Sequence, residues 1–257
     1  MIQYAICDLR FRAGRLGLLA AALVSLVAAS VGEAAAPSSG RGQIKGHIKL
    51  SGPLPGNPVI RMGMDPMCAR INAGKRVIQE TVVAALDGSL ANAFIRLRGD
   101  FPATPVPTAP VVIDQVACIY RPRVVGIRVG QTLQVKNSDP LLHNVHSLSA
   151  KRNTFNVGEP IAGMVQPFVM KDEEVMLQIK CDVHSWMTTF VGVVSNPYFA
   201  VSDDKGTFQI DNVPPGMYMI EAWQERYGTL AQTVRVKAGA TAAVEFTYTN
   251  TEKPPAR

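Results

Sequence analysis

The sequence predicts an all-β protein, and three observations lead to this prediction. Hydrophobic and polar residues alternate with a period of two in many short runs, Gly and Pro turns separate these runs, and almost no run has helical periodicity. Of the 257 residues, 47% are hydrophobic and 18% are charged, with no long charge run. These values exclude a disordered chain, and the scattered Gly and Pro exclude a collagen-like repeat.

Residues 1–36 are predicted to be a secretory signal that precedes the fold. Three arginines come before an uncharged apolar run from Leu16 to Ala29, and the segment ends in three alanines, with cleavage expected after Ala36. The run is shorter than the about 20 residues that a membrane-spanning helix needs, although a retained anchor stays an alternative. We therefore expect a secreted, periplasmic protein with no membrane span after cleavage.

The net charge of the remaining chain indicates which kinds of partner it can bind. The signal carries three basic and two acidic residues, which leaves 23 basic and 18 acidic residues and a net charge of +5. These charges form no clusters, so we do not expect a nucleic-acid partner. A mild positive charge favours weak encounters with acidic protein surfaces.

The order of the turn signals predicts three parts after the signal. Residues 37–107 form a first β segment, residues 108–196 a second block and residues 197–250 a third. Four prolines between Phe101 and Pro110 exclude a central strand there and predict a connector before the second block.

Two predicted strands of the second block lie directly before the candidate metal-binding residues. In the first, Leu133 and Val135 alternate before the turn residues Asn137-Ser138-Asp139-Pro140 end the strand. In the second, one face carries Val175, Leu177, Ile179 and Cys181. The phase of that strand directs the Cys181 sulfur toward the interior.

Metal-binding residue types gather just after these two strands. The segment His143-Asn144-Val145-His146 follows the first, and Cys181-Asp182-Val183-His184-Ser185-Trp186-Met187 follows the second. A thiolate, two imidazoles and a weak axial thioether form the blue-copper electron-transfer set. We predict one copper ion bound by Cys181, His184 and Met187, with a further histidine ligand from the segment His143–His146. A buried thiol, a loop histidine and a core methionine would explain each residue alone, but not their combination.

The axial position has other candidates in Met164, Met170 and Met176. Met176 lies five residues before Cys181, and an odd separation places it on the opposite face of a regular strand. Met164 and Met170 would need a separate loop to return to the site. We therefore expect Met187, which shares one short loop with two ligands, to be axial.

The second block resembles the cupredoxins, most closely the amicyanin, pseudoazurin and plastocyanin-like group. The likeness covers about residues 111–196 and rests on Tyr120-Arg121-Pro122, Gly130-Gln131, Asn137-Ser138-Asp139, His143-Asn144-Val145 and the Cys-x2-His-x2-Met spacing. It implies a Greek-key sandwich or barrel, with His143, Cys181 and His184 as equatorial ligands and Met187 as the axial one. Ser185 departs from related loops, which often carry Pro there, and this bears on the loop's rigidity and on the reduction potential.

Two residues beside the ligands, Asn144 and Asp182, are candidates for supporting roles. The Asn144 amide can hydrogen-bond to the backbone at Cys181-Asp182 and so hold the two ligand loops in register. An ordinary turn asparagine is the alternative. We interpret His146 as a surface or supporting residue and assign no function to His47.

The third block resembles the carboxypeptidase regulatory-like, prealbumin-type β-sandwich module. The residues that carry the likeness are Asp203-Asp204-Lys205-Gly206 before Phe208, and Pro214-Pro215-Gly216 before Tyr218. The segment from Gly42 to Ile48 resembles the first strand of that module. The resemblance implies a discontinuous sandwich of about residues 42–100 and 197–249, with the cupredoxin inserted.

Three cysteines, Cys68, Cys118 and Cys181, follow the predicted signal. An odd number in an oxidising compartment leaves one of them free, intermolecular or metal-bound. Once Cys181 is given to copper, we expect a disulfide between Cys68 and Cys118. The alternative is that either of these thiols is free or intermolecular.

Three classes of function agree with these residues. The first is a periplasmic carrier of single electrons between redox proteins, with an acidic-surfaced cytochrome or dehydrogenase as the expected partner. The second is a copper trafficking or storage protein, and the third is a non-redox binding or scaffolding module. A buried four-ligand copper can change valence but has no open position for a substrate, which favours the first class. We do not expect an enzyme, because the sequence shows neither a nucleophile motif nor a second metal cluster.

Overall fold

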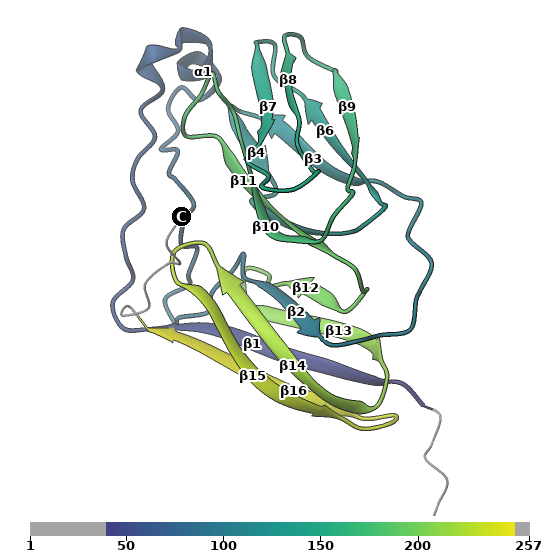
Figure 1. The fold of residues 1–257 in the computed structure, drawn as a ribbon. Helices are drawn as coiled ribbons and strands as arrows, with labels where there is room; N and C mark the ends of the chain where they lie inside the picture. Colours follow the sequence, from purple (N-terminus) through teal and green to yellow (C-terminus); the bar gives the residue numbers. More distant parts are fainter. Residues whose placement is uncertain (1–39, 250–257) are drawn as a thin grey trace, which may run out of the picture. The chain divides into compact units, whose positions relative to one another are not determined.

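The computed structural model describes residues 40–249, and the regular elements in that range are almost all strands (Figure 1). The strands form four sheets, and the only helices in this range are two short ones. The all-β prediction is thereby confirmed. The predicted signal, residues 1–36, lies outside the described residues. Among the residues described, no helix is long and apolar enough to cross a membrane.

Strands from both ends of the described chain form one sandwich, here called the discontinuous sandwich. One sheet has the order β13-β1-β16, with β1 at Gly42–Ser51, β13 at Thr207–Val213 and β16 at Thr241–Thr249. The other has the order β12-β2-β14-β15, with β12 at Phe199–Val201, β2 at Phe94–Arg98, β14 at Gly216–Gln224 and β15 at Gly228–Val236. Because β1 pairs with both β13 and β16, the N-terminal strand completes a sheet of C-terminal ones.

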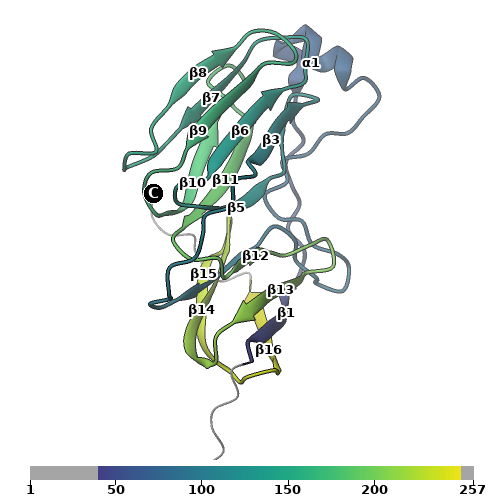
Figure 2. The same ribbon diagram turned by 90° about the vertical axis from the view of Figure 1, so that its right-hand side faces the viewer.

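The strands between β2 and β12 form a second sandwich, here called the inserted sandwich. Its first sheet has the order β4-β3-β6-β9, with β4 at Ile119–Arg121, β3 at Val111–Val116, β6 at Thr132–Asn137 and β9 at Val165–Val169. Its second has the order β5-β11-β10-β7-β8, with β5 at Val124–Arg128, β11 at Thr188–Val194, β10 at Glu174–Lys180, β7 at His143–Ser147 and β8 at Asn156–Glu159. Figure 2 shows β3, β6 and β9 side by side in the first of these sheets. The core of the inserted sandwich contains Ile113, Leu133, Val145 and Ile179.

A bulge in β10 changes the face on which Val175 lies. The pairing of β10 with β11 shifts register between Glu174 and Leu177, and Met176 takes a φ of +63° there. With this extra residue, Val175 joins Met176 in a hydrophobic cluster different from the one that holds Leu177 and Cys181. The predicted common face is therefore correct from Leu177 to Cys181 but wrong for Val175.

A segment of the first part leaves the discontinuous sandwich and packs on the inserted one. This covering segment, residues 59–80, contains the 3-10 helix η1 at Met62–Met64 and the helix α1 at Pro66–Ile71. Asp65 caps α1 by accepting hydrogen bonds from the N–H groups of Met67 and Cys68, and proline follows at the first helical position. In Figures 1 and 2, α1 lies at the same upper end of the molecule as β7 and β8. The sequence predicted a β segment for all of residues 37–107 and did not indicate such a cover.

Candidate metal centre

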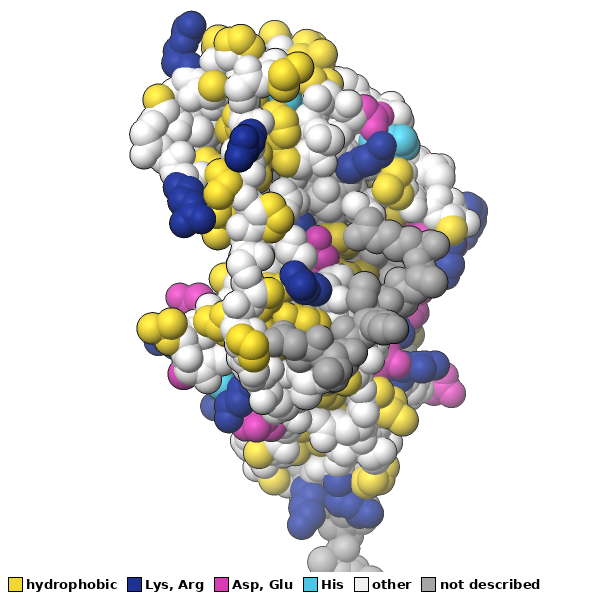
Figure 3. All heavy atoms as spheres, turned by 90° about the vertical axis from the view of Figure 1, so that its left-hand side faces the viewer, with side chains coloured by type: hydrophobic (Ala, Val, Ile, Leu, Met, Phe, Trp, Pro, Cys, Tyr) yellow, Lys and Arg dark blue, Asp and Glu magenta, His cyan; other side chains and the backbone are white. Residues whose placement is uncertain are grey.

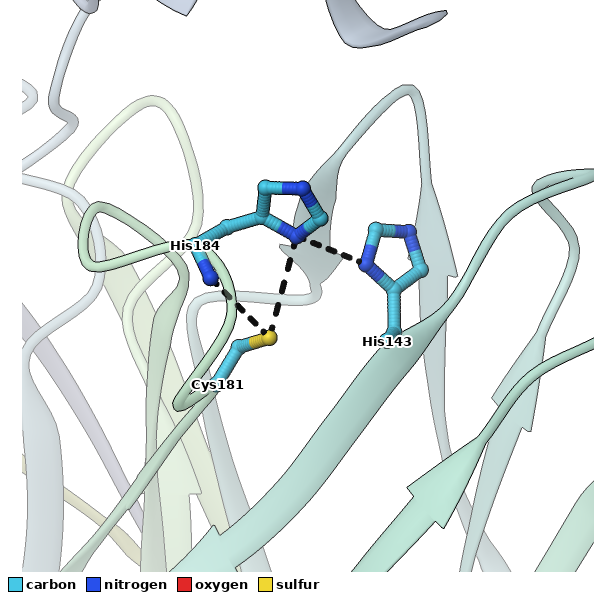
Figure 4. Close-up of side chains that lie close together, drawn as sticks. All are labelled: His143, Cys181 and His184. Carbon is cyan, nitrogen blue, oxygen red and sulfur yellow. Dashed lines mark hydrogen bonds between the residues drawn. The ribbon is translucent and has the colours of Figure 1, made fainter. Parts of the chain in front are cut away.

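Three buried side chains converge at one end of the inserted sandwich (Figure 4). His143 is the first residue of β7, Cys181 follows the last residue of β10, and His184 lies in the loop before β11. His143 Nδ1 lies 3.1 Å from His184 Nδ1, and Cys181 Sγ lies 3.8 Å from the same His184 atom. The structure thus brings together three of the four residues that the sequence predicted as ligands.

The fourth predicted ligand, Met187, closes the loop that carries Cys181 and His184. The Cys181 N–H donates to the Met187 carbonyl at 3.1 Å, and the Met187 N–H donates to the His184 carbonyl at 2.9 Å. The Met187 side chain is fully buried in the same hydrophobic cluster as Cys181. These bonds close the short loop between Cys181 and Met187.

The surroundings of Cys181 favour a thiolate. Burial alone would raise the pKa of the thiol. Hydrogen bonds from the His143 ring and from the backbone N–H groups of His184, Asn144 and Val183 outweigh burial and lower the pKa. A thiolate is the form of cysteine that binds metals.

Each histidine presents its outer ring nitrogen to a carboxylate. His143 Nε2 lies 3.0 Å from Asp139 Oδ2, and His184 Nε2 lies 2.9 Å from Asp65 Oδ2. An ionised carboxylate can only accept a hydrogen bond, so each Nε2 donates a proton to its carboxylate and each Nδ1 faces the other ring. The two Nδ1 atoms lie 3.1 Å apart, close enough to share a proton, and a bound metal ion would take the place of that proton.

The arrangement of these donor atoms fits a metal ion. Metal–nitrogen bonds of about 2.0 Å and metal–sulfur bonds of about 2.3 Å, at angles of about 100–130°, put donor atoms about 3.1–3.9 Å apart. The two measured separations, 3.1 and 3.8 Å, lie within this range. Burial opposes protonation of His143, but Asp139 and Cys181 outweigh it and raise its pKa to about 9, so the pocket attracts positive charge. A thiolate with two imidazoles is a donor set suited to copper.

The two supporting residues predicted from the sequence behave differently. Asn144 Oδ1 accepts a hydrogen bond from the Asp182 N–H at 3.1 Å, which links the two ligand loops as expected. The Asp182 carboxylate instead lies at the surface, where it pairs with His146 at 2.9 Å and with Lys180 at 2.9 Å. Asp182 therefore contributes its backbone to the site, and its side chain faces away. His47 lies on β1 and contacts Ser89, far from this centre.

Cys68 and Cys118 form a disulfide at the edge of the site. Both are fully buried, and Cys68 Sγ lies 3.6 Å from His184 Nε2. The expected bridge between the first and second parts is present, and it also brings the covering segment against a predicted ligand.

Sequence reasoning missed the carboxylates that hold the two histidines. Asp139 lies four residues before His143, in the turn that precedes β7, and this short separation could have identified it as a hydrogen-bond partner of that histidine. Asp65 lies 119 residues before His184 and gave no local signal beyond its place near Cys68. Trp186 was also missed: its ring centroid lies 5.1 Å from that of His184, and its Nε1–H donates to the Cys118 carbonyl.

A further buried acid, Glu159, lies beside the centre. It pairs across the sheet with His143, is fully buried, and neither of its carboxylate oxygens has a hydrogen-bond partner among the described residues. Burial raises its pKa to about 7, the charge of His143 opposes this rise, and Asp114 adds to it.

The raised pKa of Glu159 predicts a pH dependence of stability. A group whose pKa is raised by folding stabilises the protein below its unfolded pKa, here the ordinary 4.5, and this stabilisation disappears as the pH rises through about 7. Relative to Glu159→Gln, the metal-free wild type should therefore lose up to about 3 kcal/mol between pH 4.5 and 8. Urea unfolding of both proteins across this range measures the difference. Parallel pH curves would show that Glu159 does not titrate in this way.

Comparisons with known proteins found similarity over parts of the chain. A family model described as polysaccharide lyase family 4, domain II matches residues 171–244. No curated protein matches the chain. Among solved structures, a purple cupredoxin from Nitrosopumilus maritimus is 24% identical over 33% of this chain and 99% of its own, with a TM-score of 0.29. An amicyanin variant in its Cu(I) form is 18% identical over 39% of this chain and 98% of its own, with a TM-score of 0.30.

A copper-containing nitrite reductase from Thermus scotoductus is 17% identical over 38% of this chain and 25% of its own, with a TM-score of 0.30. None of these matches is to a carboxypeptidase regulatory-like module, so that resemblance stays an expectation. In fold, the described part of the chain combines two β-sandwiches, and the matched residues 171–244 run from the inserted sandwich into the discontinuous one.

Proposed function

We propose that this protein is a type 1 copper protein that carries single electrons between redox partners. The observation that supports this most is the convergence of the Cys181 sulfur with the Nδ1 atoms of His143 and His184, while each outer Nε2 is bonded to a carboxylate. These three side chains would hold the copper, with Met187 as a weak fourth ligand. Bound copper would supply a reversible change between Cu(II) and Cu(I).

The burial of the centre favours electron transfer over catalysis. His143, Cys181 and His184 are each at most 1% exposed, so a substrate has no access to the donor atoms. An electron does not need such access, because it can pass through the protein that covers the metal. The rigid backbone bonds of the ligand loop would keep the same geometry in both valence states, which lowers the reorganisation needed on transfer. We therefore propose that the protein is not an enzyme.

The location and the partner are part of this proposal. The signal-like N-terminus and the Cys68–Cys118 disulfide support an oxidising compartment such as the periplasm. Figure 3 shows hydrophobic side chains gathered at the end of the molecule that carries α1. Three exposed hydrophobic residues are sequence neighbours of the site: Met64, Leu142 and Val183. With the positive net charge, they suit transient docking of an acidic-surfaced cytochrome or dehydrogenase.

A copper storage or trafficking protein is the second candidate, and one observation favours it. The outer edge of His184 lies under Asp65 and is closed to solvent, which would slow copper exchange. Voltammetry of the copper-loaded protein, combined with the electron self-exchange rate, separates the two functions. A carrier should give one reversible one-electron wave and fast self-exchange. An irreversible wave or negligible self-exchange would favour storage.

Substitution of Met187 tests the axial position. A thioether stabilises Cu(II) weakly, so Met187→Leu should remove that donation and raise the reduction potential, whereas Met187→Gln supplies a harder oxygen and should lower it. Both variants should keep copper and a strong visible band, because the three other ligands supply most of the affinity. Potentials from voltammetry check this order. If neither variant changes the potential or the spectrum, Met187 only fills the core.

A further inference from the structure

We propose that Asp65 is a positioning residue for the copper ligand His184, and that the Cys68–Cys118 disulfide holds Asp65 over the site. This inference rests on the proposed copper site and adds to it a residue from outside the inserted sandwich. Asp65 Oδ2 lies 2.9 Å from His184 Nε2, and the His184 side chain is only 2% exposed beneath it. Together, Asp65 and the disulfide would make copper exchange slow.

The two carboxylates at the histidines are fixed in the same way. Asp65 Oδ1 accepts the N–H groups of Met67 and Cys68, both at 2.9 Å. Asp139 accepts the N–H groups of Ala117 at 2.8 Å and of Cys118 at 2.7 Å. Each half of the disulfide therefore donates its backbone N–H to the carboxylate that holds one histidine. The disulfide therefore links the backbone segments that hold the Asp65 and Asp139 carboxylates.

The two carboxylates differ in how they are attached to the inserted sandwich. Asp139 belongs to the inserted sandwich, in the turn between β6 and β7, so it stays near His143 whatever the covering segment does. Asp65 depends on the docking of the covering segment. Side-chain polar contacts secure this docking besides that of Asp65: the Asn72 amide donates to the Ala117 carbonyl at 3.1 Å, Gln79 donates to the Trp186 carbonyl at 3.2 Å, and the Arg121 guanidinium pairs with the Glu80 carboxylate. The disulfide is the covalent link among these attachments.

Two consequences follow for a metal held by His184. The carboxylate fixes the ring orientation and the Nε2–H tautomer, and it makes Nδ1 a stronger donor; loss of such a partner typically costs 10–100-fold in metal affinity. The cover also prevents the ring from turning outward to release the ion. Copper exchange would then require the covering segment to open.

Asp65→Asn separates the hydrogen bond from the helix cap. Asparagine caps helices as well as aspartate does, so α1 should persist. Its amide group, however, would take the place of Oδ2 and put a donor against the Nε2–H of His184, or turn away and leave that N–H unpaired. Copper loss from the reduced, Cu(I)-loaded full chain to an excess of a Cu(I) chelator should become at least tenfold faster. Cys68→Ala/Cys118→Ala should accelerate it as well.

Asp182→Asn is the matched control. Asp182 lies next to the ligand Cys181, and the change removes the same charge, but its carboxylate contacts His146 and Lys180 instead of a ligand. Its copper loss should stay within about twofold of the wild type. If Asp65→Asn releases copper at the wild-type rate, or if Asp182→Asn accelerates release equally, Asp65 does not position His184.

A measurement on the metal-free protein keeps this inference separate from the proposed function. In ¹⁵N NMR spectra, the His184 Nε2–H should be protected from exchange in the wild type and in Asp182→Asn, and this protection should be lost in Asp65→Asn. This readout needs no copper and no electron transfer. Absence of a protected Nε2–H in the wild type would overturn the inference, whereas an irreversible voltammetric wave would overturn only electron carriage.

Discussion

Cys181→Ser should abolish the intense visible absorption of the copper-loaded protein, reducing it by at least tenfold. The band of a blue-copper site comes from charge transfer between a cysteine thiolate and Cu(II), and Cys181 is the sole free cysteine among the described residues. A serine hydroxyl is a hard donor that stays protonated at neutral pH, so it supplies neither the transition nor strong binding. Absorption spectra after titration with one equivalent of Cu(II) measure the change.

The disulfide cysteines provide the control for this prediction. Cys68→Ala/Cys118→Ala should keep the visible band, even if the copper leaves faster, because neither sulfur is a ligand in the proposed site. If Cys181→Ser kept the band and the double variant lost it, the copper site would lie at the wrong cysteine.

The same double variant should be much less stable than the wild type. The bridge closes a loop with a sequence separation of 50 residues, and the chain-entropy model assigns such a loop about 4 kcal/mol. Alanine is chosen because both half-cystines are fully buried, where a serine hydroxyl would add a cost of its own. Urea unfolding of the metal-free proteins measures the loss. A loss below about 1 kcal/mol would mean that other contacts dock the covering segment.

The proposed ligands could be selected from the sequence because their signals are local. Cys181, His184 and Met187 lie within seven residues, and His143 directly follows the turn that ends β6. Strand alternation gave the burial of Cys181 correctly, since the residues from Leu177 onward follow a regular pleat. The bulge at Met176 carried no recognisable signal, because a left-handed methionine is not marked by a glycine or asparagine.

The cover over His184 was not predictable from the same patterns. α1 has six residues, too few for a helical periodicity to show, and Asp65 reaches the site through tertiary contacts alone. The cysteine count did predict the bridge, but nothing in the sequence indicated that the bridge would carry a carboxylate to a ligand. Local spacing thus revealed the donor atoms, whereas the groups that hold them depended on contacts between distant parts of the chain.

The visible and electron paramagnetic resonance spectra of the copper-loaded wild type test the central claim most directly. The account predicts one Cu(II) per chain, an intense thiolate-to-copper band, and the small parallel hyperfine splitting that a covalent copper–thiolate bond produces. A weak visible band with the large splitting of a tetragonal copper site, or no stoichiometric copper binding, would contradict it.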